Sequence, residues 1–334
     1  MPRREVAAEP AIALFPSDDA VMALPALGVA VCARVPIKRL FAPVFAARGL
    51  TLLNPDEVTD PAAITFALSF LPADDAFAPF KNLRLAASIG AGAEAIVRAK
   101  SLPADVPVVR MMDDDQADQM AAFALFHIVY WHRRFDDLLA AAKDGRWARD
   151  NAARSPREKT VGVLGYGVMG ARIAAVAADL GYQVRAFTRT PRTGDPRLQF
   201  FHGPQRDAFL AKVDFLVVVL PTTPETAGFV DAACLAALPK GAVVIHLGRG
   251  GQVVEDDLVA ALDAGHLAGA SLDVFVTEPL PADHPLWRHP KILATPHTAS
   301  QATDEAVATL VTDGLAALAR GAAPPGLVDR AAGY

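Results

Sequence analysis

An arginine, a glutamate and a histidine each follow a predicted strand in the second half of this 334-residue chain. Arg249 lies in a glycine-rich turn, Glu278 precedes a proline, and His297 follows one. When a carbonyl group is reduced, negative charge grows on its oxygen, which then needs a cation and a proton donor. A guanidinium provides the cation, an imidazole can provide the proton at neutral pH, and a nearby carboxylate favours the protonated imidazole. These residue types therefore suit carbonyl reduction.

Each of the three residues also has a plainer interpretation. Arg249 could be a surface charge, and Glu278 could merely end a strand. The glycines around Arg249 and the apolar strand before it favour a side chain that reaches a crevice. His297 alone among the histidines comes just after a strand and is followed by small residues. We assign four other histidines to structure or surface: His127, His132, His284 and His289.

A glycine-rich loop precedes these residues in the chain. Residues 161–164 predict a buried strand, a helix follows to about residue 180, and residues 184–187 predict a second strand. Three spaced glycines between strand and helix are typical of a dinucleotide site, because the helix N-terminus offers N–H groups to a pyrophosphate. We expect the loop to bind the cofactor through Gly165, Gly167, Val168, Met169 and Gly170.

The end of the second strand predicts which dinucleotide binds. NAD sites usually carry Asp or Glu there, whereas this chain has Thr188, Arg189 and Thr190, with Arg192 just beyond. A guanidinium can pair with a 2′-phosphate, and no carboxylate is present to repel one. We therefore expect NADP(H) to be preferred, with NAD(H) possible. The alternative is that Arg189 and Arg192 are ordinary solvated charges.

The elements around these motifs predict two α/β domains. In the first part, residues 11–15, 50–53, 64–71 and 83–89 read as strands, and residues 115–142 as one long helix. Further strands are predicted at 161–164, 184–187, 214–220, 242–247, 269–274 and 291–294. Helical segments separate most of them, as in a doubly wound parallel sheet.

The last predicted helix, at about residues 302–320, has no strand after it. We therefore expect the chain to return there to its first domain. The predicted architecture is a Rossmann-type nucleotide domain of residues 105–298, inserted into a flavodoxin-like substrate domain of residues 1–104 and 299–334. Both domains would be doubly wound parallel sheets.

Composition excludes several classes of protein. The net charge is −5 and no basic tract is present, so we expect no nucleic-acid binding. No stretch of 18 apolar residues occurs and the N-terminal apolar run is short, so we expect neither membrane segment nor secretory signal. Cys32 and Cys234 are the only cysteines and form no CxxC motif, which predicts no metal site and a cytoplasmic location.

Longer motifs make the chain resemble the D-2-hydroxyacid dehydrogenase family, and within it the glyoxylate/hydroxypyruvate reductase A type. The resemblance is nearly full length. It is carried by the glycine loop, the three polar segments and residues 90–94, 133–137, 285–290 and 328–334. It implies that Arg249 binds the carboxylate and carbonyl of a small 2-keto acid, that His297 is the acid/base, and that Glu278 orients His297. It also implies a homodimer, to which Trp131 and Trp147 could contribute, although a core role for both is equally open.

The resemblance assigns further residues to the two ligands. The turn at Ala91 and Gly92 would hold the substrate carboxylate, with a plain tight turn as the alternative. The cofactor site would also include Leu220, Pro221, Leu247 and Asp273. Asp273 ends a buried strand and must have a partner, which the resemblance identifies as the nicotinamide carboxamide. Two residues depart from the family: Phe70 stands in place of a tryptophan in the substrate cleft, and His246 in place of an asparagine.

The sequence thus predicts an NADPH-preferring reductase of small 2-keto acids. Two alternatives remain. A β-hydroxyacid dehydrogenase has a similar glycine loop, but it begins with its nucleotide domain and uses a lysine, whereas about 160 residues precede the loop here. A nucleotide-sensing scaffold would bind NAD(H) with little turnover, and the intact Arg249, Glu278 and His297 disfavour it.

Overall fold

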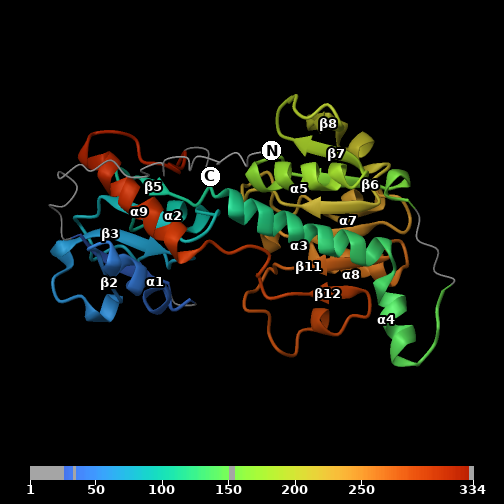
Figure 1. Ribbon diagram of the computed structural model, residues 1–334, viewed down its shortest axis with the longest axis horizontal. Helices are drawn as coiled ribbons and strands as arrows, with labels where there is room; N and C mark the ends of the chain where they lie inside the picture. Colours follow the sequence, from blue (N-terminus) through green and yellow to red (C-terminus); the bar gives the residue numbers. More distant parts are fainter. Residues whose placement is uncertain (1–25, 33–34, 150–154, 331–334) are drawn as a thin grey trace, which may run out of the picture.

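Two parallel sheets form two lobes in the computed structural model, which describes residues 26–32, 35–149 and 155–330. One sheet has the strand order β2-β1-β3-β4-β5 and the other β12-β11-β10-β9-β6-β7-β8. Figure 1 shows the sheets side by side, with the C-terminal helix α9 lying among the N-terminal elements. The prediction of two parallel-sheet α/β domains is confirmed.

Most strands of the first lobe are apolar and buried on both faces, as is typical of parallel sheets, whereas the edge strand β2 is partly exposed. Its strands are β1 (Leu27–Val31), β2 (Thr51–Leu53), β3 (Ile64–Ser69), β4 (Leu85–Ser88) and β5 (Val108–Val109). Its helices are α1 (Ile37–Ala47), α2 (Glu94–Arg98) and α9 (Asp304–Ala319). One hydrophobic cluster joins the sheet to α1 and α9, and another covers the opposite face beside α2. The predicted strand 11–15 lies outside the described residues.

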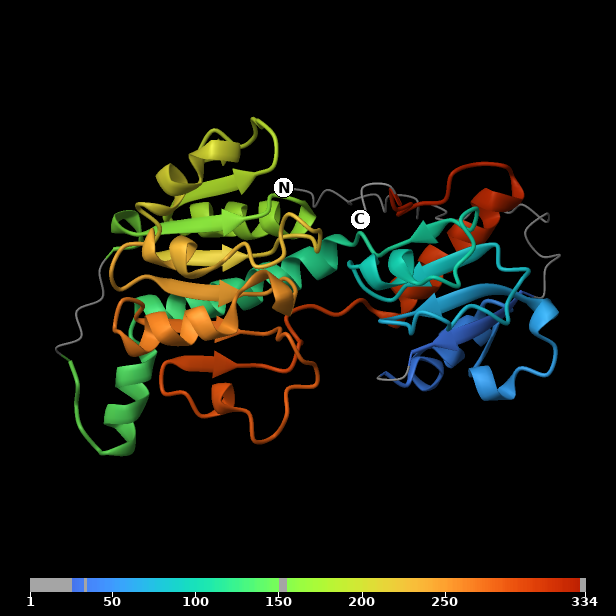
Figure 2. The same cartoon turned by 180° about the vertical axis from the view of Figure 1, so that it is seen from behind.

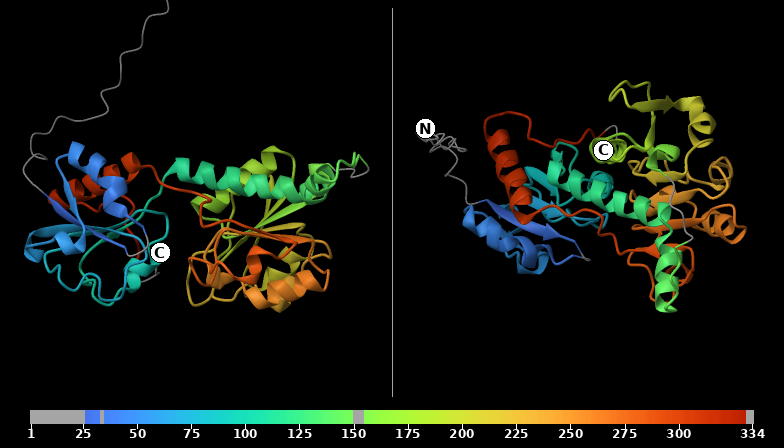
Figure 3. Two further views of the ribbon diagram at one scale, coloured as in Figure 1. Left: turned by 90° about the horizontal axis from the view of Figure 1, so that it is seen from below. Right: turned by 45° about the vertical axis from the view of Figure 1, so that its right-hand side comes forward.

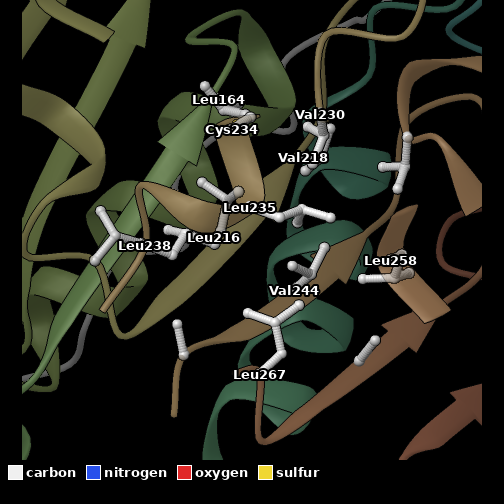
Figure 4. Packing of buried hydrophobic residues seen from close by; sticks show 14 of the residues in the cluster. Leu164, Leu216, Val218, Val230, Cys234, Leu235, Leu238, Val244, Leu258 and Leu267 are labelled. Atoms are coloured by element: carbon white, nitrogen blue, oxygen red, sulfur yellow. The ribbon is translucent and has the colours of Figure 1, made fainter. Parts of the chain in front are cut away.

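The second lobe contains the glycine loop and the three polar segments. Its strands are β6 (Thr160–Leu164), β7 (Gln183–Thr188), β8 (Leu198–His202), β9 (Phe215–Val218), β10 (Val243–His246), β11 (Gly269–Leu272) and β12 (Ile292–Ala294). Its helices are α3 (Asp114–His132), α4 (Phe135–Lys143), α5 (Val168–Asp179), α6 (Arg206–Leu210), α7 (Ala232–Ala236) and α8 (Glu255–Asp263). Helices α3 and α5 cover one face of the sheet, and α7 and α8 cover the other (Figure 2). Figure 4 shows the core between β9, β10, α7 and α8.

The chain crosses between the lobes twice, once before α3 and once before α9. Helix α9 packs against α1 and β4, so the chain returns to the first lobe after β12. Figure 3 shows both crossings between the lobes. The amide of Gln119 on α3 donates to the carbonyl of Gln301 at 3.0 Å and accepts its N–H at 3.0 Å, so the two crossings lie side by side. The second lobe is therefore inserted between β5 and α9, while the domain boundaries at residues 104 and 298 stay a prediction.

Some predicted elements differ from the structure. The single helix over 115–142 is wrong, because Arg134 adopts a left-handed conformation with φ 54° and separates α3 from α4. The guanidinium of Arg134 pairs with Asp137 at 2.5 Å in the first turn of α4. Strands β1, β5 and β8 were not predicted. No helix in the described ranges is both long and apolar enough to span a membrane.

Candidate active site

The predicted catalytic residues lie at one edge of the second sheet. Arg249 follows β10, Glu278 comes after β11, and His297 comes after β12, and these three strands are neighbours in the parallel sheet. Because the carboxyl ends of parallel strands meet at one edge, the topology brings the three side chains together. The turns after β3 and β4 of the first lobe face them.

His297 and Glu278 form a hydrogen-bonded pair. The His297 Nδ1 lies 2.8 Å from one carboxylate oxygen of Glu278, and the other carboxylate oxygen accepts the N–H of Phe275 at 3.0 Å. Burial is the largest effect on the Glu278 carboxyl and raises its pKa, but the bonds from His297 and Phe275 and the charge of Arg249 outweigh it and hold the pKa below its usual value. An ionised carboxylate only accepts, so Nδ1 of His297 carries the proton and Nε2 is left for another partner.

Arg249 joins the two lobes. Its Nη1 donates to the carbonyl of Gly248 at 2.8 Å, and its Nε lies 3.6 Å from a carboxylate oxygen of Glu94 in the first lobe. A methyl group added at Gly92 would overlap Nη2 of Arg249, so no larger residue fits there without a shift. The Arg249 side chain is 31% exposed, so part of it is accessible to solvent.

The first lobe contributes an aromatic ring and a turn to this site. The rings of Phe70 and His297 meet edge to face, with centroids 6.3 Å apart. The hydroxyl of Ser88 donates to the carbonyl of Gly92 at 2.6 Å, and Arg110 donates to the carbonyl of Ala91 at 3.2 Å. No hydrogen bond joins the N–H of Ala91 or Gly92 to another described residue. The carbonyl side of this turn is therefore fixed and its N–H side is available.

The glycine loop has the geometry of a site for phosphate groups. Gly165 has φ +98°, and a methyl group added there would lie 2.7 Å from the carbonyl oxygen of Val219. A methyl group at Gly170 would overlap the carbonyl oxygen of Gly165, so the third glycine allows helix and strand to touch. A methyl group at Gly167 would meet nothing within 4 Å, and no side chain caps α5 there. Open space thus lies over the helix N-terminus, where Val168 is exposed and Met169 is half-buried.

The residues after β7 divide into two groups. Thr188 is buried and its hydroxyl donates to the carbonyl of Thr190 at 2.7 Å. Arg192 donates to the carbonyl of Tyr166 in the glycine loop at 2.5 Å and lies over its ring. Arg189 is exposed. The pKa of Glu225 is lowered mainly by a hydrogen bond from Thr223, and the charge of Arg189 adds to this effect. Both arginines therefore follow β7, and Arg192 contacts the glycine loop, while their role toward a cofactor stays a prediction.

The chain itself supplies partners for the buried carboxylate of Asp273. That carboxylate accepts the hydroxyl of Thr295 at 2.6 Å and the N–H groups of Thr298 and Ala299 at 2.9 Å each. These bonds compensate for burial without the nicotinamide carboxamide, and they fix the segment that carries His297. His246 is also fully buried beneath the site, and neither ring nitrogen has a hydrogen-bond partner among the described residues. Burial lowers the pKa of His246 to about 4.

Comparison with known proteins gives concordant results. The family model for the D-isomer specific 2-hydroxyacid dehydrogenase NAD binding domain matches residues 125–299. A glyoxylate/hydroxypyruvate reductase A from Serratia proteamaculans is 39% identical over 274 residues, which cover 80% of this chain and 87% of that protein. The chain belongs to the D-2-hydroxyacid dehydrogenase family. A second reductase A, from Klebsiella pneumoniae, is 38% identical over 260 residues, so the predicted type is confirmed within the family.

Two solved D-2-hydroxyacid dehydrogenases match nearly the whole chain. One is from Xanthobacter autotrophicus Py2, in complex with NADPH and MES, with a TM-score of 0.85 and 37% identity, covering 93% of this chain and 99% of that one. The other is an NADPH-dependent glyoxylate/hydroxypyruvate reductase from Sinorhizobium meliloti, in complex with NADP and sulfate. Its TM-score is 0.85 at 31% identity, covering 92% of this chain and 100% of that one. The fold is therefore that of a two-lobed dehydrogenase.

Two residues at this dehydrogenase site were absent from the sequence prediction. Glu94 stands in a motif that carried the resemblance, but nothing in the sequence indicates that it crosses to Arg249 of the other lobe. Gln252 is buried beside Arg249, and the only signal for it is a polar residue in the turn that follows the arginine. Leu220 and Pro221 lie next to Gln252, and Leu247 is buried after β10.

Within the described residues, no group of His, Cys, Asp and Glu side chains is arranged to hold a metal ion.

Proposed function

We propose that this chain catalyses the NADPH-dependent reduction of small 2-keto acids, such as glyoxylate or hydroxypyruvate, to D-2-hydroxy acids. The observation that carries the proposal is that Arg249, the His297–Glu278 pair and the Gly92 turn lie together where the two lobes face each other. The relatives named for this activity and the family membership support it.

The glycine loop fits the dinucleotide that two structural neighbours hold as NADPH or NADP. Open space over Gly167 would receive the pyrophosphate at the N-terminus of α5. Arg189 and Arg192, with Thr188 and Thr190, would surround the ribose phosphate, where no carboxylate from β7 opposes it. When bound, the reduced nicotinamide supplies the hydride. NADH would bind more weakly for lack of the 2′-phosphate.

The keto acid would be held from both lobes. The N–H groups of Ala91 and Gly92 would bind its carboxylate, and Arg249 would bind the carboxylate and the carbonyl oxygen. As negative charge grows on that oxygen, the guanidinium stabilises it more strongly than it stabilises the neutral carbonyl. Phe70 would form the wall beside the substituent of the keto acid, which favours small substrates.

His297 would deliver the proton. Its Nδ1–H is engaged by Glu278, so Nε2 is the nitrogen that protonates the new hydroxyl group. Burial raises the pKa of Glu278, but its partners hold the pKa below its usual value, so the carboxylate is ionised and can stabilise the imidazolium. The pair would therefore hold a proton on Nε2 of His297 for transfer to the carbonyl oxygen.

Replacement of the cation tests the proposal. Arg249→Ala should lower kcat/KM for glyoxylate by about a thousandfold, because the growing oxyanion loses its main stabilising charge. NADPH should still bind, as followed by nicotinamide fluorescence. Unchanged turnover would overturn the assignment, and parallel assays with several 2-keto acids and with NADPH and NADH would establish both preferences. A panel without any turnover would instead favour a nucleotide-binding scaffold.

We also infer that two copies associate through α3 and α4. Exposed apolar side chains form a ridge along these helices, and successive aromatic rings touch, with 6.0 Å between the centroids of Phe126 and Tyr130 and 6.2 Å between those of Tyr130 and Phe135. Leu139 is 52% exposed and Trp147 is 92% exposed. Arg134 and Asp137 border the ridge with opposite charges, which a twofold axis can match across a self-complementary contact. Trp131, by contrast, is buried and donates to Ser271 at 2.9 Å, a core role.

A cytoplasmic location is the final part of the proposal. Cys32 and Cys234 do not form a disulfide, and Cys234 is buried, which suits a reducing compartment. Fractionation of cells that express the protein would test the location.

A further inference from the structure

Gln252 is a polar side chain buried between two loops of the site, and it is 1% exposed. Its Nε2 donates to the carbonyl of Leu220 at 2.6 Å and to that of Pro221 at 3.1 Å. Its Oε1 accepts the main-chain N–H of Arg249 at 3.1 Å. One amide group therefore joins the loop after β9, which is predicted to line the cofactor, to the loop after β10, which carries the arginine.

The packing around Gln252 allows little movement. A methyl group added at Gly248 would overlap Oε1 of Gln252, and the main-chain N–H of Gln252 donates to the carbonyl of Arg249 at 3.0 Å. On the other side, Val219 lies against Gly165 of the glycine loop. The loops after β6, β9 and β10 thus form one continuous unit with the Gln252 amide near its centre.

Among the described residues, few other side-chain hydrogen bonds involve Arg249. Its guanidinium donates to the carbonyl of its neighbour Gly248 and has a longer contact with Glu94 of the opposite lobe. The Gln252 amide is therefore the side chain of the second lobe that fixes the main chain of Arg249 relative to Leu220 and Pro221. Hydride transfer requires the carbonyl carbon and the nicotinamide to meet at a defined distance, and a displacement of about 1 Å costs about a hundredfold in rate.

We propose that Gln252 is a positioning residue for the reduction. Its amide sets the spacing between the Arg249 loop, which holds the keto acid, and the 220–221 segment, which lines the nicotinamide nucleotide. This inference rests on the proposed function. A glutamine suits the position because it both donates to carbonyls and accepts an N–H, whereas leucine of similar size does neither and a carboxylate cannot donate. A buried group left unpaired would force the loops to move.

A double-mutant cycle tests whether Gln252 acts through Arg249. Gln252→Leu should lower kcat/KM for glyoxylate by about tenfold to a hundredfold, mainly through kcat, with little change in the dissociation constant of NADPH. In the Arg249→Ala background, Gln252→Leu should cause no further loss, as measured in single turnovers with excess enzyme. Equal losses in both backgrounds, or none in the parent, would overturn the inference.

A matched control separates positioning from loss of a buried hydrogen bond. Ser271 lies in β11, is as buried as Gln252, and accepts a hydrogen bond from Trp131 of α3. Ser271→Ala removes that hydrogen bond and does not change the loops after β9 and β10. It should lower stability but leave kcat/KM unchanged. If Gln252→Leu does not yield folded enzyme, Gln252→Asn, which is too short to span both loops, should show the same kcat loss, and normal activity would overturn the inference. Full turnover by Arg249→Ala alone would instead refute the proposed function, whatever Gln252 does.

Discussion

Glu278 lies between a histidine and a main-chain N–H, and its lowered pKa keeps it ionised at neutral pH. Glu278→Gln should lower kcat/KM for keto-acid reduction by about a hundredfold. The loss should appear mainly in kcat, because the imidazole of His297 loses the hydrogen bond that orients it, and steady-state rates at several glyoxylate concentrations would measure it.

Glu255 offers a matched control for that experiment. Its carboxylate accepts the N–H of Val276 at 2.9 Å, one residue beyond the N–H that Glu278 accepts, and among the described residues no hydrogen bond or ion pair joins it to His297. Glu255→Gln should keep the parent kcat and kcat/KM. An unchanged kcat in Glu278→Gln would contradict the proposed pairing.

His127 on α3 has no part in the proposed chemistry but should affect stability in acid. It is buried between Phe123 and Phe126, and burial lowers its pKa to about 4. In the unfolded chain its pKa is about 6.5, so the unfolded state binds a proton that the native state rejects as the pH falls from about 6.5 to about 4. The native state therefore loses up to about 3 kcal/mol over that window.

His127→Leu should remove this loss. The free energy of unfolding of the variant minus that of the parent should be about 2 kcal/mol larger near pH 4.5 than at pH 7.5. Urea denaturation at both pH values measures it. At pH 7.5 the histidine is neutral in both states, so that difference reports packing alone, and parallel acid sensitivity in both proteins would argue against the effect.

At the scale of single residues, sequence predicts the convergence of Arg249, Glu278 and His297 because each follows a strand of one parallel sheet. It does not predict Glu94 or Gln252. The partners of Gln252 are main-chain groups of distant loops, and Glu94 acts across the lobes, so neither contact leaves a pattern of residue types along the chain.

Among the elements, the turn from β6 to α5 allows a paired prediction. At Gly167 a methyl group meets open space, so Gly167→Ala should fold with parent stability yet bind NADPH at least tenfold more weakly, because the methyl enters the space for the phosphates. At Gly170 a methyl overlaps the Gly165 carbonyl, so Gly170→Ala should lower the free energy of unfolding by about 1 to 3 kcal/mol. Denaturation without cofactor and fluorescence titration with NADPH separate the two effects.

The strands of the second lobe are the elements that sequence predicts best. Buried parallel strands read as short apolar runs between glycines, as at β6, β10 and β11. Strand β8 was missed because it is an edge strand with a polar residue and little burial. The break between α3 and α4 was missed because no proline or glycine marks it, and the left-handed Arg134 is specified only by its tertiary context.

For the whole molecule, the proposed association predicts a change in mass. Leu139→Glu places a charge in the ridge on α3 and α4 and should convert dimers to monomers in light scattering. Leu40 on α1 is 48% exposed and lies on the other lobe, so Leu40→Glu should leave the mass unchanged. A parent that is monomeric at micromolar concentration would refute the association.

The two hydrogen bonds between the side-chain amide of Gln119 and the main chain of Gln301 restrict how the lobes can move. They tie together the only two segments that connect the lobes within the described residues, so these act as one pivot rather than two. A rotation of the lobes about this pivot would change the distance between Arg249 and Gly92 and keep both hydrogen bonds. A translation of one lobe along the other would break them. Arg249 and Gly92 lie on opposite lobes. A small acid bound by both residues would therefore hold the two lobes together in a closed arrangement.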